Sequence, residues 1–102
     1  MKRAVRWSRA VLDDLKQQVR YIAADNPATA RDVAERIDTA ARLLGERATG
    51  RPGRVGGTYE KSVHRLPYVI AYSIEVLEGR ETLFVLRVIH TAGDWPQRQW
   101  PD

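Results

Sequence analysis

Hydrophobic positions are densest between Leu66 and Pro96, and this stretch organises the chain. It contains two apolar runs, Tyr68–Val76 and Thr82–His90, joined by the polar break Glu78–Glu81. Val, Ile, Tyr, Phe and Thr dominate both runs, which is typical of β-strands. A break this short, with a glycine inside it, connects antiparallel strands and cannot hold a parallel crossover. We therefore predict a β-hairpin whose strands are central and covered on both faces for part of their length.

A helical period of hydrophobic positions marks the first half of the chain. Ser8 is a candidate N-cap for the first helix, and Asn26 and Pro27 are suited to end it and to begin the second. We expect two antiparallel helices of roughly 17 and 19 residues. The stripe of the first helix is Val11, Leu15, Val19 and Ile22, and that of the second is Ala30, Val33, Ala34, Ile37, Ala40, Ala41 and Leu44.

Three further segments complete the predicted order. Apolar and polar residues alternate in Ala4–Trp7, which predicts a short edge strand. Side chains of Thr58–His64 also alternate between two faces, which predicts a strand before the hairpin. Between the helices and this strand, residues 45–58 hold five glycines and a proline, which predicts no regular structure. The order β-α-α-β-β-β defines one α+β domain over residues 1–102. An N-terminal strand and an antiparallel helical hairpin pack on a small antiparallel sheet.

Composition narrows the possible functions. The chain has 102 residues and no cysteine, so disulfides, cysteine nucleophiles and thiolate metal sites are excluded. Its two histidines lie far apart without carboxylates at ligand spacing, and we expect neither a metal nor another cofactor. No apolar run approaches the ~20 residues that span a bilayer, and the basic N-terminus lacks the apolar core of a signal peptide. We expect a cytoplasmic protein without a membrane partner.

Positive charge favours an acidic partner. The net charge is +4 and the isoelectric point is near 9.9, which attracts nucleic acid or acidic proteins. Arg47, Arg51 and Arg54 make the glycine-rich segment the most basic loop of the chain. This loop lacks the Lys-Ser/Thr ending of a P-loop, so it is either a solvated connector or a surface for a phosphate or a protein partner.

Five sequence blocks, in this order, resemble the ParE/RelE superfamily of bacterial type II toxin–antitoxin toxins, and the ParE branch most closely. The resemblance covers nearly the whole chain, and the fold that it implies is a helical hairpin on an antiparallel sheet. The blocks are WSRAVLDDL at 7–15, YIAADNP at 21–27, GRPGRVGGT at 50–58, LPYVIAY at 66–72 and LRVIHTAGDWP at 86–96.

The resemblance implies two alternative mechanisms. ParE-like toxins poison DNA gyrase on cleaved DNA and are neutralised by a ParD antitoxin whose C-terminal region wraps the toxin. RelE-like toxins are endoribonucleases that cut messenger RNA on the ribosome. Many relatives carry arginines where this chain has Tyr59 and Gly93. We therefore expect a gyrase poison that forms a hetero-oligomer with a ParD-like ribbon-helix-helix antitoxin and does not itself bind a specific DNA sequence.

The nuclease alternative depends on three residues. RNA cleavage without a metal needs a base for the 2′-hydroxyl, cations for the phosphate and an acid for the leaving oxygen. Lys61, Arg87 and His90 are the candidates that this chain retains, with help from Tyr59 or Tyr72 only if they share that face of the sheet. A structural interpretation stands beside this one. In it, Arg87 pairs with a carboxylate such as Glu60 and His90 caps the end of its strand.

The C-terminal segment is the other candidate site. Trp95, Arg98 and Trp100 lie within its last eight residues, and exposed Trp and Arg are typical anchors of protein interfaces. We expect Trp95 to pack on the sheet or the helices, and Trp100 either to anchor a partner or to fold back as a core plug. A third function, a non-toxic basic interaction module, would need a basic stripe with interleaved aromatic residues. Both helices instead mix charges of the two signs.

Overall fold

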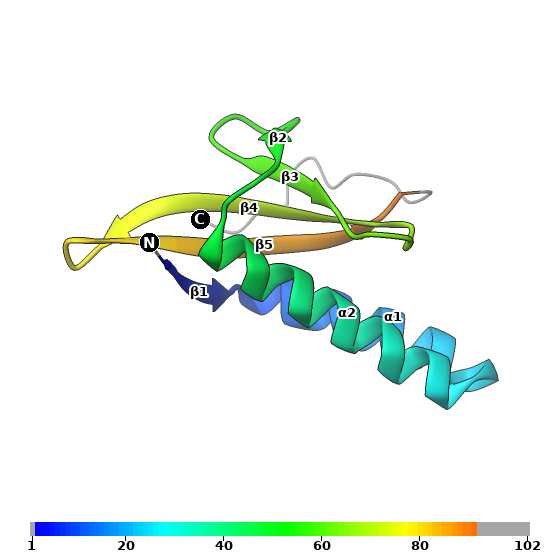
Figure 1. Ribbon diagram of the computed structural model, residues 1–102. Coiled ribbons are helices and arrows are strands. Elements are labelled where there is room, and N and C mark those ends of the chain that lie inside the picture. Colours follow the sequence, from blue (N-terminus) through cyan, green and yellow to red (C-terminus); the bar gives the residue numbers. More distant parts are fainter. Residues whose placement is uncertain (1, 92–102) are drawn as a thin grey trace.

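The computed structural model describes residues 2–91, and Figure 1 shows the arrangement of their helices and strands. The predicted order of strand, helical hairpin and three further strands is confirmed. One prediction was wrong, because the glycine-rich segment contains a short extra strand, β2, that pairs with β3. The elements are β1 (Ala4–Trp7), α1 (Arg9–Asp25), α2 (Pro27–Glu46), β2 (Arg51–Pro52), β3 (Tyr59–Ser62), β4 (Tyr68–Leu77) and β5 (Arg80–His90).

Side-chain caps define the ends of the two helices. Ser8 Oγ accepts a hydrogen bond from the Val11 N–H at 3.1 Å, and Asn26 Oδ1 accepts one from the Thr29 N–H at 3.1 Å. Pro27 occupies the first turn of α2, where its missing N–H has no cost. The helices have 17 and 20 residues, close to the predicted lengths. No helix in residues 2–91 is long and apolar enough to cross a membrane.

The sheet is mixed and has the strand order β1-β5-β4-β3-β2. We had predicted an antiparallel sheet, and this holds for β2 to β5, but β1 pairs with β5 in parallel, with Val5 opposite Leu83. A parallel partner needs a long connection, and the two helices and three strands between β1 and β5 provide it. Ser8 continues this contact, because its N–H donates to the Val85 carbonyl and its hydroxyl donates to the Leu86 carbonyl.

A tight turn joins β4 and β5 as predicted. Leu77 and Arg80 form the last pair of the ladder, so only Glu78 and Gly79 lie between the strands. Both have positive φ angles, 54° and 79°, which is typical of a type I′ turn and easiest for glycine. Further along the hairpin, the register shifts at Ala71/Tyr72, which marks a β-bulge.

The core lies between the helical hairpin and one face of the sheet. The first six residues of β4 are buried at consecutive positions, which confirms that this strand is covered on both faces there. Gly45, near the end of α2, allows β1 to approach the helix, because the Arg3 N–H donates to the Gly45 carbonyl at 2.7 Å. A Cβ at this position would lie 2.6 Å from Val5 Cγ2. The centre of the core consists of Val11, Ile37, Ala41, Ile70, Tyr72, Leu83 and Val85.

Candidate functional site

A buried carboxylate organises the basic loop. The Glu60 side chain is 3% exposed, and its Oε2 atom accepts a hydrogen bond from the Arg54 N–H at 2.8 Å. Its Oε1 atom lies 3.6 Å from Nη2 of Arg51, whose side chain remains mostly in solvent. Arg47 is set apart at the end of α2, where its N–H donates to the Leu43 carbonyl. Arg51 and Arg54 thus both contact the Glu60 carboxylate, which holds the basic loop in place. The sequence did not indicate this role, because it marked Glu60 only as one residue of an alternating strand.

Arg87 forms a bidentate ion pair with Asp14 of α1. Its Nε donates to Asp14 Oδ2 and its Nη2 donates to Asp14 Oδ1, both at 2.8 Å. Asp14 Oδ2 also accepts a hydrogen bond from the Val88 N–H at 3.2 Å. The expectation of a carboxylate partner is confirmed, but Glu60 as that partner was wrong, because Glu60 is held by the basic loop. A guanidinium already held by a carboxylate fork is poorly suited to receive a phosphate.

The other two nuclease candidates lie in different surroundings. His90 lies opposite Tyr68 in the ladder and packs edge-to-face on its ring, with centroids 5.2 Å apart. The Tyr68 hydroxyl donates in turn to Gln18 Oε1 of α1 at 3.3 Å. Lys61 lies on β3, opposite Ile70. Arg87 therefore belongs to an ion pair with α1 and His90 to an aromatic contact, and the nuclease assignment of Lys61, Arg87 and His90 stays a prediction from the sequence.

The two tyrosines that we had considered as helpers stack on each other. The rings of Tyr59 and Tyr72 have centroids 5.5 Å apart, and the buried Tyr72 hydroxyl donates to the Thr49 carbonyl at 2.7 Å. Burial raises the pKa of Tyr72, the neighbouring Tyr59 raises it further, and Arg3 lowers it. Burial also raises the pKa of Tyr68. Both hydroxyls are thus protonated at neutral pH and act as donors, which does not suit them to serve as general bases.

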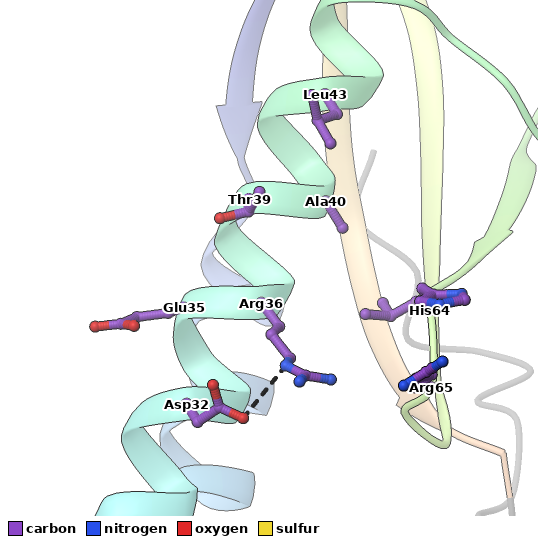
Figure 2. A pocket seen from close by; sticks show the side chains of 9 residues that line it. Asp32, Glu35, Arg36, Thr39, Ala40, Leu43, His64 and Arg65 are labelled. Atoms are coloured by element: carbon purple, nitrogen blue, oxygen red, sulfur yellow. Dashed lines mark ion pairs between the residues drawn. The ribbon is translucent and has the colours of Figure 1, made fainter.

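A groove of about 540 Å³ separates α2 from the turn between β3 and β4 (Figure 2). Ala40, Leu43 and Val63 give it an apolar part, while charged side chains line the rest. Arg36 extends from α2 into the space facing His64 and Arg65, as Figure 2 shows. The charged and polar lining residues are Asp32, Glu35, Arg36, Thr39, His64 and Arg65.

A second groove of about 540 Å³ lies on the other side of α2, against the start of β1. Leu43 and Thr39 line both grooves, so Leu43 forms an apolar ridge between them, with 56% of its surface exposed. We call the two grooves and this ridge the α2 surface. The second groove is lined by Lys2, Arg3, Ala4, Val5, Thr39, Arg42, Leu43 and Glu46.

Ion pairs on the α2 surface are exposed and therefore weak. Arg36 pairs with Asp32 at 3.2 Å, and Arg42 pairs with Asp38 at 3.0 Å. Exposed pairs of this spacing contribute only ~0.3–0.5 kcal/mol, so a partner can replace them at little cost. Within residues 2–91, Lys2 and Arg65 have no ion pair at all. The surface thus offers an apolar ridge with cations on both sides that are readily available to an acidic partner.

Some expected sites lie elsewhere. Trp95, Arg98 and Trp100, proposed as partner anchors, and Gly93, where relatives carry arginine, are outside the described residues. No group of three or more His, Cys, Asp or Glu side chains within residues 2–91 could hold a metal ion. Leu43 and its flanking grooves could not be identified from the sequence, where the only signal is an apolar residue off the buried stripe of α2.

Two solved structures of toxin–antitoxin assemblies contain chains with this fold. The chromosomal ParDE toxin–antitoxin system from P. aeruginosa superposes with a TM-score of 0.76 at 20% identity, covering 87% of this chain and 96% of that chain. The toxin–antitoxin complex RelBE2 from Mycobacterium tuberculosis gives a TM-score of 0.57 at 24% identity, covering 91% and 95%. At these identities the likeness shows the fold alone.

Sequence comparison then identifies the family. The profile described as "ParE toxin of type II toxin-antitoxin system, parDE" matches residues 5–95, and the chain belongs to this family. A relative from Sinorhizobium fredii named "Putative toxin Y4kP" is 36% identical over 97 residues, covering 94% of this chain and 96% of the relative. The resemblance drawn from the sequence blocks is therefore confirmed.

Proposed function

We propose that this ParE-family toxin poisons DNA gyrase in the cytoplasm and is neutralised by a cognate ribbon-helix-helix antitoxin of the ParD type. Membership of the ParE family over residues 5–95 supports the proposal. The observation that carries it is the bidentate ion pair between Arg87 and Asp14, in which both hydrogen bonds are 2.8 Å long. A metal-free nuclease would need this strand arginine for a phosphate, and here it is held by a carboxylate.

The α2 surface is the proposed binding site for the antitoxin. An amphipathic segment could cover the Leu43 ridge with apolar side chains and place acidic side chains in the flanking grooves. Arg36 and Arg65 would receive them on one side, and Lys2 and Arg42 on the other. The net charge of +4 would steer such a segment towards the toxin over several ångströms.

Parallel assays on the purified toxin test the choice of target. We expect loss of gyrase supercoiling and accumulation of cleaved DNA, with intact messenger RNA on translating ribosomes. Efficient cleavage of ribosome-bound message with supercoiling untouched would favour the RelE-like alternative, for which Lys61, Arg87 and His90 are the candidates. If neither assay responded, the chain would be a basic interaction module without toxicity.

A substitution on the ridge tests the antitoxin site. Leu43→Glu places a carboxylate where an apolar and acidic segment would bind, so we expect antitoxin affinity to fall by a factor of roughly ten to a hundred. Leu12→Glu is the matched control, because Leu12 is also an exposed leucine but lies on α1 and lines neither groove. Equal affinities of the two variants would place the antitoxin elsewhere.

The salt dependence of association tests the electrostatic part of the proposal. Screening between exposed charges strengthens as ionic strength rises, so the on-rate of complex formation should fall from low to high salt. Stopped-flow measurement on the wild-type pair is the direct readout. An on-rate that did not change with salt would show that the basic groove residues do not steer the antitoxin.

A further inference from the structure

The edge of β4 is open along its second half. β3 pairs with β4 only as far as Tyr72, although β4 continues to Leu77 (Figure 1). Thr58 would be the next residue to pair, but the turn between β2 and β3 holds it. Its N–H donates to the Val55 carbonyl at 3.1 Å, and its hydroxyl donates to the same carbonyl at 2.6 Å. Residues 73–77 therefore have β5 on one side and no described strand on the other.

The turn geometry shows which backbone groups face the open edge. Leu77 and Arg80 close a two-residue hairpin, so Leu77, and with it Glu75, directs its N–H and C=O towards β5. The alternate residues Ile74 and Val76 direct theirs away from β5. Tyr68 is an even number of residues from Ile74 and Val76, so its backbone groups point to the same side of β4 as theirs. Its carbonyl accepts a hydrogen bond from the Val63 N–H at 2.9 Å, which shows that this side faces away from β5. Within residues 2–91, the outward groups of Ile74 and Val76 have no backbone partner.

Side chains at this edge combine exposed apolar surface with negative charge. Val76 is 70% exposed, and Tyr59, on the end of β3 that meets this edge, is 41% exposed. Glu75 and Glu78 have no ion pair within residues 2–91, and Glu81 is paired with Arg3 at 3.0 Å. The tip also carries Arg80, and Arg3 offsets Glu81, so Glu75 and Glu78 leave a small excess of negative charge there in a chain of net charge +4.

These features select one kind of occupant. An exposed edge strand is a template for another strand, and natural edges are usually blocked by charged side chains, lysine above all, by proline or by a covering segment. Residues 73–77 contain no lysine or proline, and instead have the exposed Val76 and Glu75, whose charge repels an acidic strand but not a basic one. A second copy of the chain would bring the same Glu75 and Glu78 carboxylates together, which disfavours self-association. A basic extended segment would meet no such repulsion.

We propose that the β4 edge from Ser73 to Leu77 binds an extended segment of another protein in which apolar and basic residues alternate. The segment would add a strand to the sheet, and its backbone would bond to Ile74 and Val76. Its apolar side chains would cover Val76 beside Tyr59, and its basic side chains on the other face would pair with Glu75. This surface is separate from the α2 surface and does not depend on the target of the toxin.

A synthetic peptide of alternating valine and arginine, with blocked ends, is the probe. Amide hydrogen exchange, followed by NMR on the full chain, should show the Ile74 and Val76 amides exchanging fast in the free protein and slowly with saturating peptide. A peptide of alternating valine and glutamate should give little protection. If these two amides stayed unprotected, or if both peptides protected them equally, the proposal would be overturned.

Two variants sharpen this test. Val76→Pro removes an N–H that the hairpin ladder does not use, so binding should weaken roughly fivefold, the effect of one hydrogen bond, while Val76→Thr should bind as the wild type does. Glu75→Lys keeps every backbone group and should reverse the preference between the two peptides. An unchanged preference would contradict the assigned role of Glu75. Protection that rises with protein concentration alone would show that a second copy occupies the edge.

Discussion

The ion pair between Asp14 and Arg87 allows the sharpest prediction, because it separates structural from catalytic roles. We consider Asp14→Leu, Arg87→Met and the double variant, which replace the charged groups with apolar side chains. Each single substitution leaves one partner charged in a mostly buried place. The double substitution removes both charges together.

The expected cost follows from the geometry. The Asp14 carboxylate accepts three hydrogen bonds, two from Arg87 at 2.8 Å and one from the Val88 N–H at 3.2 Å. The side chains of Arg87 and Asp14 are 17% and 13% exposed, so the pair lies between a surface pair and a dry one. We expect Asp14→Leu to lower the free energy of unfolding by ~2–4 kcal/mol, and Arg87→Met to lower it by slightly less. For a domain of this size that lowers the Tm by roughly 10–25 °C.

Denaturation with urea and thermal melts measure these values. The double variant should lose clearly less stability than the sum of the two single variants, which gives a coupling energy of ~1.5–3 kcal/mol in a double-mutant cycle. Each variant is also assayed for toxicity at a temperature where its melt shows it folded. We expect folded Arg87→Met to retain toxicity, because the pair holds α1 against β5 and takes no part in the activity.

Two results would refute this reasoning. Additive losses in the cycle would mean that the two side chains do not stabilise each other. An Arg87→Met variant that is as stable as the wild type but inactive would make Arg87 a functional residue and return the nuclease mechanism to first place.

Three further predictions concern other parts of the chain. Gly45→Ala should cost ~1–3 kcal/mol of stability in urea denaturation, because its Cβ would lie 2.6 Å from Val5 Cγ2, while Gly56→Ala, with nothing within 4 Å, should be close to neutral. The raised pKa of Tyr72 stabilises the fold below about pH 10, the ordinary tyrosine value, and this contribution is lost as pH rises through the folded-state pKa. Tyr72→Phe should therefore cost ~1 kcal/mol at neutral pH and lessen the alkaline loss of stability, and a variant with unchanged alkaline behaviour would contradict this. Removal of Gln97–Asp102 should reduce toxicity in a growth assay while antitoxin binding largely survives, since Trp100 is the proposed anchor, and a folded, fully toxic chain ending at Pro96 would rule this out.

Local chemistry made much of the fold predictable from the sequence. Ser8, Asn26 and Pro27 mark the ends of the helices because caps act on backbone groups within a few residues. The hairpin was predictable because Glu78 and Gly79 suit a turn between two runs rich in β-branched residues. Each of these signals acts over less than ten residues, and each was confirmed.

Non-local partners were not predictable in the same way. Two contacts join groups more than seventy residues apart in the sequence. One is the ladder between β1 and β5, and the other is the ion pair between Asp14 and Arg87, whose positions differ by 73. Asp14 lies on the first helix among other charged residues, and nothing in the sequence marked it as the partner of Arg87. Glu60 was assigned to a strand face by alternation, and the loop that buries it could not be placed from the sequence.

The parallel pairing of β1 with β5 also sets the order in which the sheet can form during synthesis. β1 leaves the ribosome before both helices and strands β2 to β4, but its partner residues Thr82–Val85 follow all of them. The helices depend on local hydrogen bonds and can form early, whereas β1 has no strand partner until β5 has emerged. A chain that stalls before β5 emerges therefore lacks the strand that joins β1 to the rest of the sheet.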